Sequence, residues 1–330
     1  MIILGIETSC DETSASILKD GKILSNIVVS QLIHKDFGGV VPFLAAKDHE
    51  KLVYKVVNQA LEEASIKVDD LDALAVTQGP GLIGSLLIGL NYAKGLSVGL
   101  EIPMIGVNHL HGHILSGLID NSINFPFICL LVSGGHTQIL KINNELDYEI
   151  LAKTVDDAAG EAFDKGARIL GLNYPGGPEI DRVSKNGNLE TYSFTIPKVK
   201  SSLVDFSFSG LKTALLYKVN ELNKSLLKTE ISNIAACYQE TIIDTLFEKL
   251  NIVLNQNKTN NVLVVGGVSA NTRFREKSQQ FEKLLNVNII FPDFKYCTDN
   301  AAMIAMAGYV KYNKGIISSL DITPYSSIKN

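Results

Sequence analysis

The chain has 330 residues, of which 46% are hydrophobic and 20% charged, and its formal net charge at pH 7 is −5. This length suffices for two domains of ordinary size, and the composition is typical of a globular protein with a full core. The mild acidic excess excludes a protein that grips RNA through an overall positive charge. Any contact with nucleic acid is therefore expected to be local, or shared with a partner.

The cysteines and the N-terminus indicate a reducing, cytoplasmic location. No C-x-x-C pair occurs among the four cysteines, which we expect to be free thiols. The chain opens directly on a strand pattern, residues 2–6, without a basic or Arg-rich presequence. The most apolar stretch, residues 81–100, contains Asn91, Lys94 and five glycines, which favours a buried helix over a membrane span.

The first half alternates strand and helix patterns. Residues 13–18 and 23–29 alternate on either side of Asp20-Gly21, a strong two-residue turn signal, and predict a β-hairpin. Helical spacing of apolar residues then predicts a helix over residues 47–64. The pattern continues with a strand at 73–77, a helix at 81–100, a strand at 104–107 and a helix that begins at the histidines.

A similar plan restarts in the second half. Strands are predicted at 127–132 and 137–142, with a tight turn between them. The remainder is predicted to be mainly helical around one buried strand, with helices at 156–170, 208–218, 229–254, 269–285 and 300–310 and the strand at 262–265. The polar stretch 181–205 is interpreted as an excursion from this half.

Two hairpins with small or polar residues at their bends, 7–18 and 131–140, indicate a duplicated α/β unit. In such a fold the ligand would lie in a cleft between the halves. We therefore predict two lobes, residues 1–125 with the histidine motif and residues 126–330 with a helical insertion.

Three histidines lie within five residues, at His109, His111 and His113. On a helix, the four-residue spacing of His109 and His113 puts both rings on one face, as in two-histidine metal sites, and His111 points elsewhere. Burial in an apolar core is the alternative, but the paired spacing favours a metal. The metalloprotease pattern H-E-x-x-H is absent because residue 110 is leucine, so its glutamate general base is missing.

Asp299 precedes the last predicted helix and has two possible uses. It could cap that helix, or it could complete a ligand set with His109 and His113. Two histidines and one carboxylate leave positions open for substrate oxygens, and such a set suits iron or zinc.

Two segments predict phosphate or proton chemistry near bends. In residues 7–13, hydroxyls and backbone N–H groups could hold phosphate, and Asp11 could accept a proton. An ordinary polar turn is the alternative for this segment. In residues 131–137, Gly134 and Gly135 permit close backbone approach to a ligand, although a hairpin turn alone would also want them.

Three further segments belong to the second half. Asp157, Glu161 and Asp164 share a helix face, and their repulsion favours contact with a cation or with hydroxyls of a ligand. The alternative is a solvated helix start, where acidic residues are common. The glycines of 174–178 could abut a nucleoside, or form a plain loop. Residues 264–271 run from a buried strand through two glycines into a helix, which suits an adenosine or phosphate contact.

Taken together, these segments show that the chain resembles the TsaD family over nearly its whole length. These are the tRNA threonylcarbamoyladenosine transferases, once described as O-sialoglycoprotein endopeptidases. The resemblance rests on long motifs in the same order: GIETSCDET, TQGPGLIGSLLIG, NHLHGHI, LVSGGHTQIL, DDAAGEAFDKGARILGL with YPGGP, FSFSGLKTAL, GGVSANTRFR and CTDNAAMIA.

The resemblance implies a fold and an activity. The fold is the α/β, duplicated actin-like ATPase and sugar-kinase fold, with two lobes around a central cleft. The activity is transfer of threonylcarbamoyl from threonylcarbamoyl-AMP to N6 of the adenosine 3′ of the anticodon, in tRNAs that read codons beginning with A. One divalent metal per chain is implied, iron in preference to zinc, with His109, His113 and Asp299 as ligands.

The remaining site residues are also implied by the resemblance. Asp11 looks like the family's important acid near the reacting group. The adenylate contacts would be Leu131, Val132, Ser133, Gly134, Gly135, Asp164, Gly177, Asp181 and Asn271. The implied partners are tRNA, a paralogous inactive subunit of the same fold and a small ATPase (TsaB- and TsaE-like), and a separate synthase that supplies the adenylate. No membrane partner is expected.

One segment departs from the family pattern. Where the family usually reads V-P-E-L-A-S-R-x-H, this chain has Phe43 in place of the glutamate and Lys47 in place of the arginine. A lysine is a point charge and not a planar fork, so the resemblance does not extend to a role of this loop in acid–base work or in binding phosphates.

Three other functions are kept as alternatives. An ATP-dependent small-molecule kinase of the same fold class would use Mg²⁺ and an aspartate, without paired histidines. A protease would lack its glutamate. A nucleotide-binding scaffold without catalysis would serve only as an assembly platform.

Overall fold

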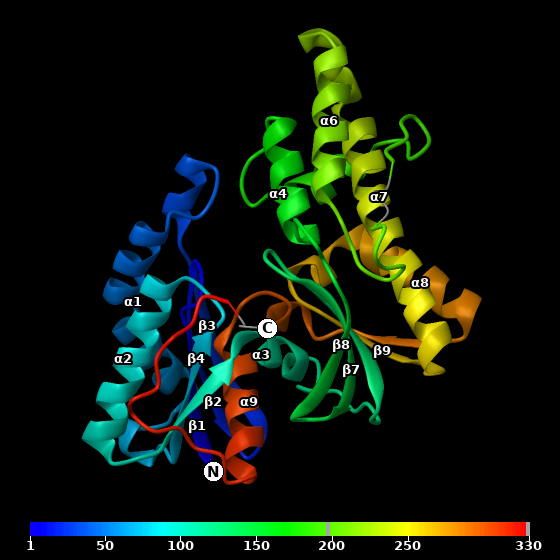
Figure 1. The fold of residues 1–330 in the computed structure, drawn as a ribbon. Helices are drawn as coiled ribbons and strands as arrows, with labels where there is room; N and C mark the ends of the chain where they lie inside the picture. The colour runs from blue at the N-terminus through cyan, green and yellow to red at the C-terminus, as the bar shows by residue number, and fades with distance from the viewer. Residues whose placement is uncertain (196–198, 328–330) are drawn as a thin grey trace. The chain divides into compact units, whose positions relative to one another are not determined.

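The structure is a computed structural model that describes residues 1–195 and 199–327. The chain divides into two compact units. Unit 1 comprises Met1–Ser122 together with Pro292–Asn330, and unit 2 comprises Ile123–Phe291. Figure 1 shows the elements of both units.

Unit 1 is built on a five-stranded mixed sheet in the order β3-β2-β1-β4-β5. Strands β1, β2 and β3 are joined as antiparallel neighbours, whereas β4 and β5 run parallel to β1. The predicted hairpin and both predicted strands are thus confirmed. Their bounds are β1 Ile2–Glu7, β2 Glu12–Lys19, β3 Lys22–Ser30, β4 Ala73–Gly79 and β5 Met104–Asn108.

Helices cover both faces of this sheet because successive strand residues point to opposite sides. Leu4 and Ile6 pack in a core cluster with α1 and α2, while Ile3 packs on the other side with α9. The helical elements are η1 Leu32–Phe37, α1 Pro42–Ala64, η2 Val68–Asp70, α2 Ile83–Leu100, α3 His109–Ser116, η4 Phe294–Tyr296 and α9 Ala301–Asn313.

Helix α2 is the apolar stretch that the sequence analysis interpreted as a buried helix. Among the described residues it is the one helix long and apolar enough to cross a membrane, and 33% of that stretch is buried inside the protein. Leu86, Leu90 and Ala93 are buried, while Leu87 and Val98 are exposed. Length and composition alone are weak evidence for a membrane span, because core helices pass the same test.

Unit 2 repeats the sheet of unit 1. Its strand order is β10-β9-β6-β7-β8, again with three antiparallel neighbours, β6 to β8, and two strands parallel to the first of them. The duplication predicted from the two hairpins is therefore visible in the topology. The bounds are β6 Phe127–Val132, β7 Thr137–Asn144, β8 Asp147–Lys153, β9 Asn261–Val265 and β10 Asn288–Ile290.

The helices of unit 2 include one that the sequence analysis did not predict. The sequence predicts a turn at residues 174–178 and a polar insertion at residues 181–205. In the structure, helix α5 spans Gly176–Ser184 and overlaps both segments. Pro178 lies in the first turn, where a missing N–H is tolerated, so proline and glycine here begin a helix. Residues 196–198 of the excursion lie outside the described residues. The other helical elements are α4 Ala159–Ile169, α6 Ser209–Glu221, α7 Lys224–Asn257, η3 Gly267–Ala270 and α8 Thr272–Leu285.

The domain boundaries differ from the predicted 1–125 and 126–330. The first boundary lies close to residue 125, but residues 292–330 belong to unit 1. The reason is the packing of α9, whose small residues lie directly on β1 and β4. A Cβ on Gly5 would lie 2.5 Å from the Ala301 carbonyl oxygen, and one on Gly308 would lie 2.3 Å from the Ala75 Cβ. A sequence pattern read in chain order does not reveal this return.

The close approach of α9 to the sheet is expected to be sensitive to one methyl group. Gly308→Ala should lower the free energy of unfolding by about 1–3 kcal/mol, because the new Cβ overpacks against Ala75. The matched control is Gly95→Ala on α2, where a Cβ meets open space and should add about 0.5–1 kcal/mol of helix stability. Urea unfolding of the two variants measures the contrast, and equal stabilities would contradict this packing.

Candidate functional site

Helix α3 brings His109 and His113 together, as their spacing predicts. The helix begins at His109 because Asn108 is its N-cap, with Asn108 Oδ1 accepting a hydrogen bond from the His111 backbone N–H at 3.0 Å. The rings of His109 and His113 have centroids 4.7 Å apart at an interplanar angle of 86°. Both side chains are buried, so two imidazoles share one face of a buried helix.

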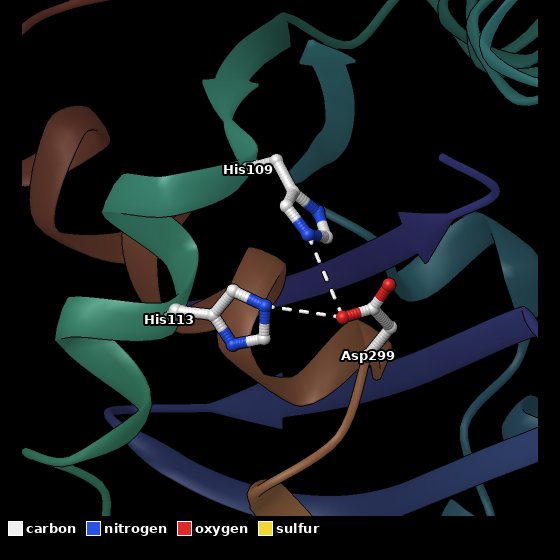
Figure 2. A group of neighbouring side chains, drawn as sticks. All are labelled: His109, His113 and Asp299. Atoms are coloured by element: carbon white, nitrogen blue, oxygen red, sulfur yellow. Dashed lines mark ion pairs between the residues drawn. The ribbon is translucent and has the colours of Figure 1, made fainter. Parts of the chain in front are cut away.

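Asp299 lies against these two rings, as Figure 2 shows. Its Oδ1 is 3.5 Å from Nε2 of His109 and 3.1 Å from Nε2 of His113. The neighbouring Asn300, and not Asp299, caps α9 by accepting from the Met303 N–H. The capping alternative for Asp299 is therefore wrong, and its carboxylate is available to the histidines. One ligand atom from each of the three residues lies within 4.8 Å of the others, an arrangement able to hold a metal ion.

Glu7 supports this group from behind, and the sequence analysis did not single it out. It is fully buried at the end of β1, and its Oε2 lies 3.3 Å from Nδ1 of His109. The same carboxylate accepts from the Ser9 N–H at 2.5 Å and from the Thr77 hydroxyl. Because the Glu7 carboxylate accepts hydrogen bonds, we assign the proton of His109 to Nδ1, which leaves Nε2 facing Asp299. Carboxylates commonly orient metal-binding histidines in this way. A carboxylate that ends a buried strand is the sequence signal that could have identified it.

His113 supplies a direct test of whether these residues fit a metal. Within the described residues neither of its ring nitrogens makes a hydrogen bond, although both are buried. Nε2 is close enough to Asp299 for an ion pair, but its geometry is not that of a hydrogen bond. Because buried polar atoms are normally satisfied, a metal ion beside Nε2 fits this residue better than an empty site.

The charges around the group favour a cation. Burial disfavours the charged form of His109, but Asp299 and Glu7 outweigh it and raise the pKa of His109 well above its usual range. Burial likewise opposes ionisation of Asp299, but the two histidines hold its pKa well below its usual range. Burial, Asp299 and Asp11 together raise the pKa of Glu12 well above its ordinary value. Several carboxylates thus converge where a positive charge would relieve their repulsion.

The hydroxyls of residues 7–13, which the sequence analysis considered for phosphate binding, are used inside the protein. Thr8 Oγ1 donates to the Ser85 carbonyl at 2.9 Å, and Ser9 Oγ lies 3.2 Å from Nδ1 of His109. Thr13 Oγ1 lies 2.8 Å from Nδ1 of His49. The polar-turn interpretation therefore suits these hydroxyls better, while Asp11 is half-buried between them.

The segment that departs from the family pattern presents its changed residues to solvent. Phe43 is 75% exposed and Lys47 is also exposed. The buried His49 instead ties α1 to the β1–β2 turn, with Nε2 3.0 Å from the Cys10 carbonyl oxygen.

In unit 2, four glycine-containing segments form a closed set of contacts that we call the glycine ring. It comprises the β6–β7 turn 133–136, helices α4 and α5, and the β9–α8 connection 266–272. The Gly160 N–H donates to the Ser133 carbonyl at 3.2 Å, and a Cβ on Gly160 would lie 2.5 Å from that oxygen. Gly266 has φ +94°, and a Cβ there would lie 2.5 Å from the Val132 carbonyl oxygen. Only glycine permits both approaches.

Two predicted aspartates close the glycine ring on its other side. Asp164 Oδ1 accepts from the Gly176 N–H at 2.7 Å, which joins α4 to the start of α5. Asp181 Oδ2 accepts from the Thr272 hydroxyl at 2.7 Å, which joins α5 to the start of α8. The starts of α4, α5 and α8 are therefore linked in series to the 133–136 turn, and the N–H donors at helix starts suit an anion.

Asn271 belongs to the glycine ring, and a cavity adjoins the ring. Asn271 caps α8 by accepting from the Phe274 N–H at 2.9 Å, and its Nδ2 donates to Gln239 at 2.7 Å. Next to it lies a cavity of about 420 Å³ whose lining includes Asp181, Gln239 and Thr272. Its volume falls within the range of small-molecule sites.

The other residues predicted for unit 2 divide into exposed and buried groups. A Cβ on Gly134, Gly135 or Gly177 would meet open space, so these backbones are accessible. The side chains of Leu131 and Val132 are fully buried in β6, so that only their backbone could contact a ligand. Asp157 and Glu161 form ion pairs with Lys165 Nζ at 2.7 and 2.8 Å. The cation predicted beside this acidic face is therefore a lysine of the same helix.

The duplicated mixed sheets and their helices form the fold of the actin-like ATPase and sugar-kinase class. The chain is similar in fold to full-length HypF in its phosphate- and nucleotide-bound form, with a TM-score of 0.62 at 15% identity. That similarity covers 97% of this chain and 47% of HypF. The fold class predicted from the sequence is confirmed.

Within this class the chain belongs to the TsaD family, tRNA N6-adenosine threonylcarbamoyltransferase, whose family model matches residues 22–306. Its relatives of that name include a protein of Thermosipho africanus, 50% identical over 100% of both chains. Another, from Kosmotoga olearia, is 48% identical over 99% of both chains. These relatives support the transferase interpretation and not the kinase alternative.

Proposed function

We propose that this protein transfers the threonylcarbamoyl group of threonylcarbamoyl-AMP to N6 of the adenosine 3′ of the anticodon, in tRNAs that read codons beginning with A. The family of the chain supplies the reaction class. The observation that carries the proposal is the group of the buried His109 and His113 with the half-buried Asp299, because nitrogen-rich ligand sets do not suit the Mg²⁺ of a kinase.

His109, His113 and Asp299 would hold one divalent ion, iron in preference to zinc. Imidazole and carboxylate ligands suit both metals, and three protein ligands leave positions open for oxygens of the substrate. When bound, the ion supplies positive charge that offsets the charge on the adenylate phosphate. Glu7 keeps His109 in the tautomer that presents Nε2 to the centre.

The glycine ring would hold the AMP part of the adenylate. The backbones of Gly134, Gly135 and Gly177 are open enough for close approach, with Leu131, Val132 and the buried Ser133 contributing backbone alone. Asp164, Asp181 and Asn271 are fixed by hydrogen bonds that leave further acceptor capacity for ribose or base groups. The N–H groups at the helix starts supply the positive end of each dipole.

The transfer itself is an acyl substitution. The N6 amine of the adenosine attacks the carbamoyl carbonyl carbon, the bond from that carbon to the phosphate oxygen breaks, and AMP leaves with the electron pair. Backbone N–H donors stabilise the developing oxyanion, and the amine gives up one proton. Asp11 is proposed as the acceptor of that proton, since its charge acts together with that of Asp299 on the neighbouring Glu12.

The proposed partners are those that the resemblance to the family implies. A separate synthase would supply the adenylate, and a paralogous inactive subunit of the same fold with a small ATPase would assist on the tRNA. No basic excess is available for a strong grip by this chain alone.

The test is a single-turnover reaction with chemically made threonylcarbamoyl-AMP, tRNA and the partner proteins, with ATP removed. Modified adenosine and stoichiometric AMP should appear, as measured by mass spectrometry of the tRNA nucleosides and by chromatography of the nucleotides. Unmodified tRNA together with ATP-dependent phosphorylation of a small hydroxyl compound would favour a kinase instead.

A second expected outcome concerns tRNA binding. With a net charge of −5, the isolated chain should bind tRNA weakly, and its affinity should fall steeply with salt because the contacts are few and electrostatic. Adding the paralogous subunit should strengthen binding. Filter binding at increasing KCl measures both effects, and tight, salt-insensitive binding by the isolated chain would contradict them.

A further inference from the structure

The segment after α9, residues 316–325, lies along the edge of the unit 1 sheet, and we call it the C-terminal strap. The Ser318 N–H donates to the Met104 carbonyl at 2.8 Å, and the Gly106 N–H donates to Ser318 Oγ at 2.9 Å. Strand β5 is the last strand in the sheet order, so the strap covers backbone groups that an open edge would expose. Figure 1 draws this segment in red.

The strap continues past the end of β4. Gln78 Nε2 donates to the Thr323 carbonyl at 2.9 Å, and the Tyr325 N–H donates to the Gln78 carbonyl at 3.3 Å. A Cβ on Gly79 would lie 2.4 Å from the Tyr325 carbonyl oxygen and 2.9 Å from its ring. The strap and the end of β4 therefore pack without a gap, which fixes the place of Tyr325.

The Tyr325 hydroxyl contacts Asn108, the N-cap residue of helix α3. Asn108 Nδ2 donates to Tyr325 Oη at 2.9 Å, while Asn108 Oδ1 accepts from the His111 N–H at 3.0 Å. The two hydrogen bonds use opposite atoms of one amide. Turning the amide over would lose both, so the hydroxyl holds Asn108 in its capping orientation.

We propose that Tyr325 is a positioning residue for the metal centre, acting through Asn108 on the first turn of α3. The cap fixes where the helix begins, and His109 is the first residue of that helix. The direction of its Nε2 therefore depends on the strap as well as on Glu7. This inference rests on the metal centre of the proposed function, and it adds a residue distant in the sequence that tunes that centre.

The test is a titration of metal-free protein with Co²⁺, followed by the visible absorption bands that report ligand geometry. Tyr325→Phe keeps the ring packing and removes the hydrogen bond from Asn108, so the Co²⁺ affinity should fall about two- to tenfold, with altered bands. Thermal unfolding of the metal-free variant should match the parent. The matched control is Tyr217→Phe on α6, an exposed tyrosine of unit 2 that should leave the titration unchanged.

A double-mutant cycle separates positioning from general stability. Asn108→Ser keeps a capping oxygen but loses the amide donor, so Tyr325→Phe should have no further effect on Co²⁺ affinity in that background. Full additivity of the two changes, or parent-like affinity and bands in Tyr325→Phe, would overturn the inference. A third arm, His109→Ala with His113→Ala, should lose Co²⁺ binding. Retention in that arm would overturn the proposed metal centre itself.

Discussion

Replacing His109 and His113 together by alanine should empty the metal centre and lower the transfer rate by at least about a hundredfold. The change removes two of three ligands, and even the partners behind such ligands are worth about 10–100-fold in metal affinity or activity. The fold should survive, because the change also removes the two buried nitrogens of His113 that make no hydrogen bond with the described residues. Elemental analysis gives the metal content, and circular dichroism confirms folding.

The matched control for this experiment is His111→Ala. His111 is a buried histidine on the same helix but lies outside the group that could hold a metal. Its replacement should cost stability while leaving the metal content near one ion per chain. If the His109 and His113 double variant kept the metal content of the parent, these two ligands would be wrong.

Gly177→Val should weaken binding of AMP and of the adenylate on the order of a hundredfold, without loss of fold. A Cβ at Gly177 meets open space, so valine is accommodated in the free protein. Its extra methyl groups would occupy the space proposed for the ligand, and even a methylene in a fitted pocket changes affinity roughly 10–200-fold. Isothermal titration with AMP measures the effect.

The same substitution at an accessible glycine elsewhere provides the comparison. Gly99 lies on α2 in unit 1 and also meets open space, so Gly99→Val should leave AMP affinity unchanged. Parent-like AMP affinity in a folded Gly177→Val variant would remove this residue from the proposed nucleotide site.

The sequence predicted the elements whose signals are local. The four-residue spacing of His109 and His113 requires only a helix, and the alternation around Asp20-Gly21 requires only a hairpin, so both were correct without tertiary information. The predicted hairpins at the start of each half also indicated the duplication that the two sheet orders confirm.

Helix α5 and the role of Asp299 depended on their surroundings. Glycine and proline punctuate loops and helix starts alike, and the Asp164 hydrogen bond to the Gly176 N–H helps to fix the helical alternative. Asp299 and Asn300 are both good capping residues. Because α9 begins at Ala301, the capping residue is Asn300. That choice leaves the Asp299 carboxylate with the histidines.

The sequence by itself determined which side chains are available for a metal and which glycines allow close backbone approach, because residue type and short spacing settle those properties. Only the tertiary structure decided that Pro292–Asn330 returns to unit 1, that Glu7 lies behind His109, and that Tyr325 reaches the cap of α3. The physical reason is that burial and side-chain orientation come from packing between segments far apart in the chain. Periodicity within one segment does not specify its partner on another.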